Sequence, residues 1–494
     1  MEVYPVHLLD NAENYRKAFV AYLLVFNDAL DAQKLADSLS ELLQIGDWKK
    51  LAGRLHVNGG KQKQGYLELH VPQQFTTAEP AIGFSNTVFD CNAEQHHLGR
   101  LLAPFSADDT VQSLSPDLMA FTGVPHIPRS MQELMERGGG PQLYLHVTNF
   151  SDATVVSLTW PHYLMDAMGL EALLRNWSLM VNDEAERVTP LLGAHTDTLR
   201  EAVDMDPGPK EELILEKLSM GFFALLRLGF QFLCASLCGR KWEERRIALS
   251  PAKVDQLCRR ARGELSANKN ANAFISEGDI LAAWTAQMLA RSQANAPITV
   301  TTIVNARFKL NSLKEQTDGC YVQNLLMIAF TCFAAGCDRE PLGSAALSYR
   351  QQLAEQCTQP QMLSHFRMQL AHVAAKGKQR MLFGASGSSI LAVNNLAKID
   401  TFRDVNFAGA VVCRGASECG KGATESDRLN PPGTIIYYHP MSVHRESSNI
   451  SFFRILGRDH RGRLLLEGSF RPETWEQIVE DLAGQQDESM LPLK

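Results

Sequence analysis

The rest of this chain is organised around the stretch Thr159-Trp160-Pro161-His162-Tyr163-Leu164-Met165-Asp166-Ala167-Met168-Gly169. An apolar, β-branched run at 153–158 precedes this stretch and predicts a buried strand. The segment 170–177 follows it and predicts a helix. His162 is therefore expected where a strand ends in a loop, so that the strand fixes its backbone while its side chain can meet a ligand.

His162 can carry acid–base chemistry because imidazole titrates near neutral pH, takes a proton from a hydroxyl or amine and returns it within one turnover. Asp166, four residues later, has two functional interpretations: it orients the ring as in a catalytic triad, or it points away and pairs with a cation. A structural interpretation is that His162 is an ordinary half-buried histidine and that Asp166 caps the next helix. The H-x-x-x-D spacing alone does not separate these interpretations, because so loose a pattern recurs by chance.

Composition describes an ordinary globular protein of 494 residues, with 45% hydrophobic and 21% charged residues, enough for two or three domains or one large two-lobed body. The net charge of −7 is spread along the chain without a basic block, which argues against nucleic acid as the main partner. The ten cysteines form no C-x-x-C pair, as expected for reduced thiols in a cytosolic protein. The N-terminus lacks the features of a signal peptide, so a cytoplasmic location is expected.

An apolar segment at 218–238 approaches the length of a membrane span. Arg227 and Gln231 interrupt it, and a central arginine costs about 2.5–3.5 kcal/mol on insertion scales. A buried or interfacial helix is therefore expected in place of a transmembrane span, with peripheral membrane contact as the lesser alternative.

Hydrophobic periodicity predicts strands and helices in both halves of the chain. Strands are expected at 18–26, 67–71, 142–148, 246–250 and 298–304, and helices at 31–43 and after Ser276-Glu277-Gly278-Asp279, which predicts a capping box. A polar, proline-containing linker signature at 182–217 lies between the halves. The predicted organisation is an N-terminal lobe at 1–205, a linker and crossover helix at 206–245 and a C-terminal lobe at 246–494, with a ligand cleft between the two α/β lobes.

Five separated blocks carry a family resemblance over nearly the whole chain. They are Leu8-Leu9-Asp10, Trp48-Lys49-Lys50-Leu51-Ala52-Gly53-Arg54-Leu55, Trp160-Pro161-His162-Tyr163-Leu164-Met165-Asp166, Asn305-Ala306-Arg307 and Gly319-Cys320-Tyr321-Val322-Gln323-Asn324. In this order the blocks resemble those of the BAHD-type acyltransferases, in particular their fungal branch, within the chloramphenicol-acetyltransferase-like superfamily. Five ordered blocks are far more specific than the H-x-x-x-D spacing alone.

Three departures from the family pattern stand out. Gly169 comes two places later than the family's glycine, and Cys320 separates Gly319 from Tyr321. Asn406-Phe407-Ala408-Gly409-Ala410 stands where the family has D-F-G-W-G, and only Phe407 clearly matches. In the family this segment is regarded as structural, so the departure bears on loop geometry and donor entry more than on the chemistry. Asn406 cannot form the ion pair that an aspartate would.

The resemblance implies two chloramphenicol-acetyltransferase-like lobes, each a mixed sheet with helices, and a tunnel between them. It implies His162 as the general base in that tunnel, and an ion pair of Asp166 with Arg307 that is structural. Asn394 and Asn395 lie near the place where the family supplies a hydrogen-bond donor to the carbonyl oxygen of the reacting thioester. The alternative is that these two asparagines form turn or backbone hydrogen bonds, and the sequence leaves both open.

The implied function is an acyl-CoA-dependent O-acyltransferase that transfers a group other than aminoacyl, with acetyl as the expected group, to a hydroxyl of a fungal secondary metabolite. Acyl-CoA would be a co-substrate, with no tightly bound cofactor and no metal, and the protein would be a monomer. One alternative keeps the fold but uses an acyl carrier protein donor or catalyses condensation or cyclisation. Another alternative is that the protein is a non-catalytic member of the family. The presence of His162 argues against this, because nothing structural in the sequence requires a histidine at that position.

Overall fold

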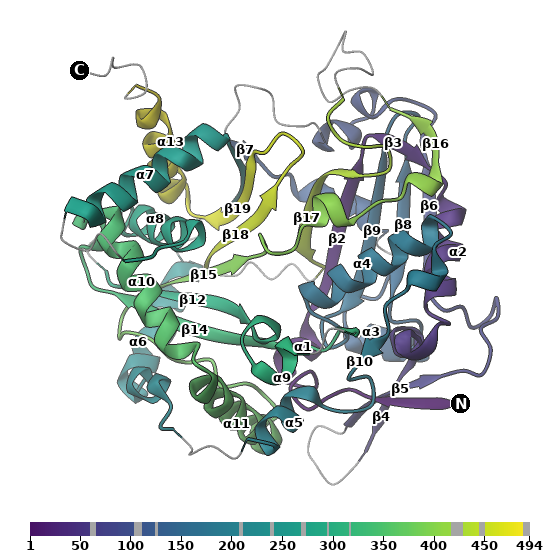
Figure 1. The fold of residues 1–494 in the computed structure, drawn as a ribbon, viewed down its shortest axis with the longest axis horizontal. Helices are drawn as coiled ribbons and strands as arrows, with labels where there is room; N and C mark the ends of the chain where they lie inside the picture. The colour runs from purple at the N-terminus through teal and green to yellow at the C-terminus, as the bar shows by residue number, and fades with distance from the viewer. Residues whose placement is uncertain are drawn as a thin grey trace.

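The computed structural model describes residues 1–59, 66–102, 111–123, 127–206, 211–237, 242–267, 273–293, 296–315, 318–415, 428–443 and 450–487. Within these residues the chain forms two lobes, each built on a mixed β-sheet with helices packed on it (Figure 1). In the view of Figure 1 the N-terminal lobe lies on the right and most of the C-terminal half on the left. The two-lobed α/β fold predicted from the sequence is confirmed.

The N-terminal lobe is built on a five-stranded sheet. Its strands, in spatial order, are β17 (Ile435–Ser442), β2 (Phe19–Phe26), β9 (Thr154–Pro161), β8 (Tyr144–Asn149) and β6 (Gly83–Val88). The central strand β9 has all eight residues buried, which explains its continuous apolar sequence. Helices α2 (Ala32–Leu42) and α4 (Ala167–Val181) pack together, and the indole of Trp177 donates to the carbonyl oxygen of Leu35 at 3.1 Å. The β2, β9 and α2 predictions are confirmed.

The C-terminal lobe is built on a seven-stranded sheet. Its strands, in spatial order, are β14 (Leu326–Phe333), β12 (Ile298–Asn305), β15 (Ser389–Asn395), β18 (Ser451–Arg458), β19 (Leu464–Phe470), β11 (Glu243–Leu249) and β7 (Val111–Ser113). Its helices include α7 (Pro251–Ala267), α8 (Glu277–Arg291), α10 (Leu342–Gln356), α11 (Gln359–Lys376) and α13 (Pro472–Asp487). The capping box at Ser276 is confirmed, because its hydroxyl accepts from the Asp279 amide and the Asp279 carboxylate accepts from the Ser276 amide.

Smaller elements complete the chain. A three-stranded sheet contains β1 (Glu2–Pro5), β5 (Tyr66–Val71) and β4 (Arg54–Asn58), while β10 (Leu191–Leu192) pairs with β13 (Cys320–Tyr321) and β16 (Val411–Arg414) with β3 (Asp28–Leu30). The short helices are α1 (Glu13–Lys17), α3 (Met131–Glu136), α5 (Thr198–Asp204), α9 (Asn311–Lys314) and α12 (Thr401–Asp404).

The two lobes exchange strands. β17, from the C-terminal half, pairs antiparallel with β2, and β7, from the N-terminal half, pairs antiparallel with β11. A buried carboxylate on β19 ties the exchanged strand to the C-terminal sheet, since Glu467 accepts from Tyr437 at 2.6 Å and contacts His439 at 2.7 Å. The lobe boundaries at 1–205, 206–245 and 246–494 stay a prediction. The strand pairing shows in addition that each half of the chain contributes a strand to the sheet of the other lobe.

The apolar segment forms helix α6 (Phe222–Leu237), as predicted. Its placement is not that of a buried helix, because the side chains of Phe222, Phe223 and Phe230 are 69%, 83% and 65% exposed. No helix in the described part of the chain has both the length and the apolarity needed to cross a membrane.

Candidate active site

The loop that carries His162 is fixed at several points between β9 and α4. The His162 amide donates to the carbonyl oxygen of Ala18 at 2.8 Å, and the His162 carbonyl accepts from the Asn324 side chain at 2.9 Å. The indole of Trp160 donates to the Met165 carbonyl at 3.1 Å and closes the loop. The backbone of His162 is therefore held by contacts from both lobes before any substrate binds.

The imidazole of His162 is partly shielded from solvent. Its Nδ1 atom is buried and has no hydrogen-bond partner among the described residues, which leaves Nε2 as the nitrogen to meet a substrate. The ring of Tyr15 lies against it, with 5.0 Å between ring centroids. Burial lowers the pKa of His162, and the negative charge of Asp166 offsets only part of this effect. At neutral pH the ring is therefore uncharged and able to accept a proton.

The carboxylate of Asp166 is fully buried and faces Arg307. The Arg307 guanidinium donates to both carboxylate oxygens, at 2.8 and 3.1 Å. The backbone amides of Gly169 and Leu325 also donate to this carboxylate, at 2.8 and 3.1 Å. No contact among the described residues is a hydrogen bond from Asp166 to the His162 ring, so this is the geometry of a buried ion pair and helix cap.

Arg307 connects this pair to the C-terminal lobe. It lies just after β12 and also donates to the carbonyl oxygens of Tyr321 and Gln323, at 3.0 and 2.8 Å. Gly169 lies where α4 meets the same segment, and a Cβ on it would stand 2.7 Å from the Val322 carbonyl oxygen. The later position of this glycine therefore has a reason, since the first turn of α4 approaches the segment there.

Asn324 and Asp10 support the His162 loop, a role that sequence reasoning missed. The Asp10 carboxylate accepts from the Asn324 amide at 3.1 Å and from its side chain at 2.9 Å. Asp10 is buried, and burial raises its pKa against the opposing charge of Lys50. Both residues lie in blocks that carried the family resemblance, but nothing in the sequence indicated that positions so far apart meet.

The two candidate oxyanion donors lie at the end of β15 with different surroundings. The Asn395 side chain is exposed and its oxygen accepts from the Ala397 amide at 3.0 Å, which is a turn contact. Asn394 is half-buried. Its side chain points to the opposite face of β15 from those of Leu391 and Val393, which lie in the core of the C-terminal lobe. Asn394 is in register with Arg454 on β18, whose guanidinium donates to the carbonyl of Pro440 on β17. Asn394 therefore lies on the sheet face that meets the N-terminal lobe.

The segment 406–410, which stands where the family has D-F-G-W-G, is held in place by hydrogen bonds and aromatic packing. The Asn406 amide donates to the Ser178 hydroxyl at 3.0 Å, and its carbonyl accepts from the Asn182 side chain at 2.8 Å. Phe407 is fully buried and stacks on Phe26, with 5.5 Å between ring centroids. Amide hydrogen bonds and aromatic packing therefore hold this segment on the N-terminal lobe.

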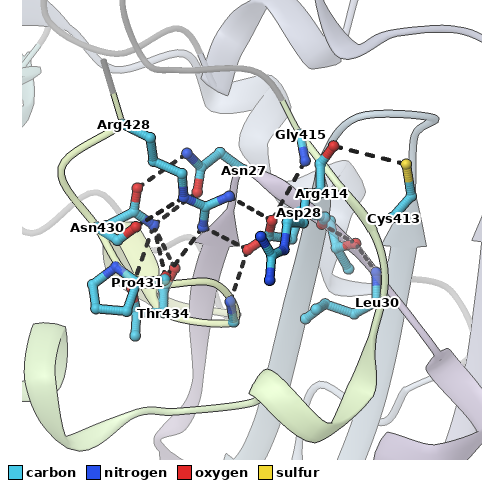
Figure 2. Close-up of polar contacts among 12 residues, drawn as sticks. Asn27, Asp28, Leu30, Cys413, Arg414, Gly415, Arg428, Asn430, Pro431 and Thr434 are labelled. Carbon is cyan, nitrogen blue, oxygen red and sulfur yellow. Dashed lines mark hydrogen bonds and ion pairs between the residues drawn. The ribbon is translucent and has the colours of Figure 1, made fainter. Parts of the chain in front are cut away.

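A buried ion pair holds residues 428–433, just before β17, on the N-terminal lobe (Figure 2). The guanidinium of Arg428 donates to the two carboxylate oxygens of Asp28 at 2.6 and 2.7 Å, and the Gly433 amide donates to the same carboxylate at 2.8 Å. Asn27 and Asn430 exchange side-chain amide hydrogen bonds at 3.1 and 2.8 Å. Figure 2 shows these side chains converging between β3 and the segment before β17, so this polar cluster attaches β17 to the N-terminal lobe.

Known proteins resemble the chain over nearly its whole length. No protein-family profile matches it. The acetyltransferase pyiB of Pyricularia grisea is 30% identical over 486 residues, which cover 97% of this chain and 93% of that protein. The chain belongs to the fungal branch of the BAHD-type acyltransferases. It is an acyltransferase, as the sequence predicted. The O-acetyltransferase PaAT-2 of Phomopsis amygdali is 29% identical to this BAHD-type chain over 501 residues, or 97% of each protein.

Solved structures share the fold of this BAHD-type protein. TRI101 of F. graminearum, solved with coenzyme A and T-2 mycotoxin, is 13% identical and aligns with a TM-score of 0.64 over 97% of each chain. Vinorine synthase, also 13% identical, aligns with a TM-score of 0.54 over 97% of this chain and 92% of its own. At 13% sequence identity, the similarity to these two structures establishes the fold alone.

Proposed function

We propose that this protein is an acyl-CoA-dependent O-acyltransferase that transfers an acetyl group to a hydroxyl of a fungal secondary metabolite, with His162 as the general base. The proposal includes a cytoplasmic monomer with no tightly bound cofactor and no metal. The observation that carries it is the geometry of the site: the backbone of His162 is held at the end of β9 by Ala18 and Asn324, and the Asp166 carboxylate is paired with Arg307 and leaves the His162 ring free. Coenzyme A as the donor carrier is supported by TRI101, solved with coenzyme A and T-2 mycotoxin.

In the proposed reaction, the two substrates meet at His162 in the tunnel between the lobes. Nε2 of His162 takes the proton of the acceptor hydroxyl as its oxygen attacks the thioester carbonyl carbon. The tetrahedral intermediate collapses, the carbon–sulfur bond breaks, and the imidazolium returns the proton to the leaving thiolate. The products are an ester and free coenzyme A, and no covalent enzyme intermediate forms.

The intermediate carries negative charge on the former carbonyl oxygen, which needs a hydrogen-bond donor. We propose Asn394 for this role in preference to Asn395, because Asn394 lies on the face toward the N-terminal lobe and Asn395 is engaged in a turn. Replacing Asn394 with alanine should lower kcat by about 10²–10³ with little change in KM. Asn395→Ala is the matched control, and an equal loss in both variants would refute the assignment.

The donor and the reaction are tested by incubating the wild-type protein with a panel of acyl-CoAs and a hydroxylated metabolite extract. The proposal predicts thiol release that requires the extract, together with a product heavier by the acyl group in mass spectra. The same panel loaded on an acyl carrier protein is run in parallel. Transfer from the carrier-bound donor alone would replace coenzyme A in the proposal, and no product from either donor, by a folded protein, would refute acyl transfer.

A further inference from the structure

Helix α6 carries a row of large apolar side chains that face solvent. Phe222, Leu226, Phe230 and Leu233 are spaced at intervals typical of one side of a helix, and Phe223 lies beside them. Each of these five side chains is more than half exposed. Exposed apolar patches of this kind mark contacts with a partner protein or a membrane, so this face requires an explanation.

The apolar row has a fixed place on the outside of the molecule. Figure 1 shows α6 at the margin of the C-terminal half. The Met220 amide, just before the helix, donates to the carbonyl oxygen of Leu382 at 3.4 Å, and the Gly384 amide donates to that of Leu218 at 2.8 Å. These hydrogen bonds attach the start of α6 to the C-terminal lobe.

The charge of this part of the chain indicates what covers the row. The sequence from Lys217 to Trp242 contains four basic residues and no acidic residue, in a chain whose net charge is −7. Among the described residues of this segment, Lys217 and Arg227 are exposed. Arg227 directly follows Leu226, at the edge of the apolar row. An apolar row bordered by cations is complementary to a lipid surface, where acyl chains lie beneath anionic headgroups.

Other partners for α6 match this pattern less well. The helix is not a transmembrane span, since no helix in the described part of the chain is long and apolar enough to cross a membrane. Two copies of the protein docked through α6 would bring their basic residues together, and like charges across an interface repel. A bilayer avoids this conflict, because basic side chains can reach the headgroups while the phenylalanines enter the apolar region.

We propose that α6 is an interfacial helix that attaches this protein reversibly to the surface of an anionic lipid bilayer. The helix lies in the plane of the surface, its apolar row about 5–10 Å into the boundary between headgroups and acyl chains, and the two lobes stay in water. Anionic lipids are typical of the cytoplasmic leaflet, so this inference agrees with the cytoplasmic location proposed above. It goes beyond the proposed function and does not depend on acyl transfer.

The test is co-sedimentation of the full-length protein with vesicles of phosphatidylcholine alone and of phosphatidylcholine mixed with phosphatidylserine. We expect wild type to bind the mixed vesicles, to bind phosphatidylcholine alone more weakly, and to bind the mixed vesicles more weakly in about 1 M salt than in about 0.1 M salt. A variant with both Phe223→Ser and Phe230→Ser should bind the mixed vesicles at least about tenfold more weakly, because it removes two apolar side chains that enter the bilayer.

Val88→Ser is the matched control, because Val88 is also an apolar residue, 61% exposed, but lies on β6 of the N-terminal lobe. This control should bind the mixed vesicles as wild type does. Both variants should unfold at the same urea concentration as wild type, since the side chains that they change are exposed.

Four results would overturn the inference. They are no binding of wild type to either kind of vesicle, equal binding to both kinds at either salt concentration, equal binding by wild type and the double phenylalanine variant, and a lipid-free wild-type dimer that the double variant converts to a monomer, which would assign the row to a second copy of the chain. These outcomes are read without any acyl transfer. A failure of the proposed function, seen as no acylated product from a folded protein, therefore stays distinguishable from a failure of this inference.

Discussion

Replacing Arg307 with methionine should strongly destabilise the protein, because it leaves the carboxylate of Asp166 buried without its counter-charge. Asp166 is 0% exposed and Arg307 is 11% exposed at the side chain, and the change removes two hydrogen bonds to Asp166 and two to the carbonyls of Tyr321 and Gln323. Breaking a buried pair by removing one partner typically costs about 3–5 kcal/mol. Since globular proteins are stable by about 5–15 kcal/mol, this is a large share of the total.

The assay is urea unfolding followed by tryptophan fluorescence, with the free energy of unfolding extrapolated to water. Arg175→Met is the matched control, because Arg175 also pairs with an aspartate, Asp404 at 3.0 Å, but is 59% exposed at the side chain. The control should lose at most about 1 kcal/mol. If Arg307→Met lost no more free energy of unfolding than Arg175→Met, the Asp166–Arg307 pair would not hold the His162 loop, and the reasoning would be refuted.

Three further predictions follow from the site and its supports. The kcat/KM of acyl transfer should fall at acid pH with an apparent pKa below the ordinary histidine value of 6.5, because burial keeps the His162 ring neutral to lower pH. A pH–rate profile in which kcat/KM falls with an apparent pKa above 6.5 would contradict this. Gly169→Ala should cost about 1–3 kcal/mol in urea unfolding, because its Cβ would stand 2.7 Å from the Val322 carbonyl oxygen, and an unchanged midpoint would show that α4 does not pack there as described. Arg428→Met should cost about 3–5 kcal/mol, because the Asp28 carboxylate is fully buried, and a loss under 1 kcal/mol in the same assay would show that water reaches the pair.

The local structure of this chain could be predicted because it depends on nearby residues. The apolar run 153–158 indicated β9, since a strand buried on both faces needs apolar side chains at nearly every position. Ser276 and Asp279 indicated the start of α8, since a capping box is a pattern within four residues. His162 could be singled out for the same reason, as a histidine between a strand and a helix.

Contacts between distant positions could not be predicted from local patterns. Nothing near Ile435 indicates that β17 joins the N-terminal sheet, because pairing depends on the path of the whole chain. The link from Asp10 through Asn324 to His162 brings together three parts of the chain and was missed for the same reason. The alternatives for Asp166 also needed coordinates, and the structure shows that it both caps α4 and pairs with Arg307.

The central claim is that His162 is the general base of acyl transfer, and the most direct measurement is the rate of ester formation by His162→Ala beside His97→Ala. The acyl donor is saturating in both assays, and circular dichroism checks that both variants are folded. General base catalysis predicts a loss of about 10²–10⁴ in kcat for His162→Ala and an unchanged rate for His97→Ala, whose side chain is exposed. Ester formation at the wild-type rate by folded His162→Ala would contradict the account.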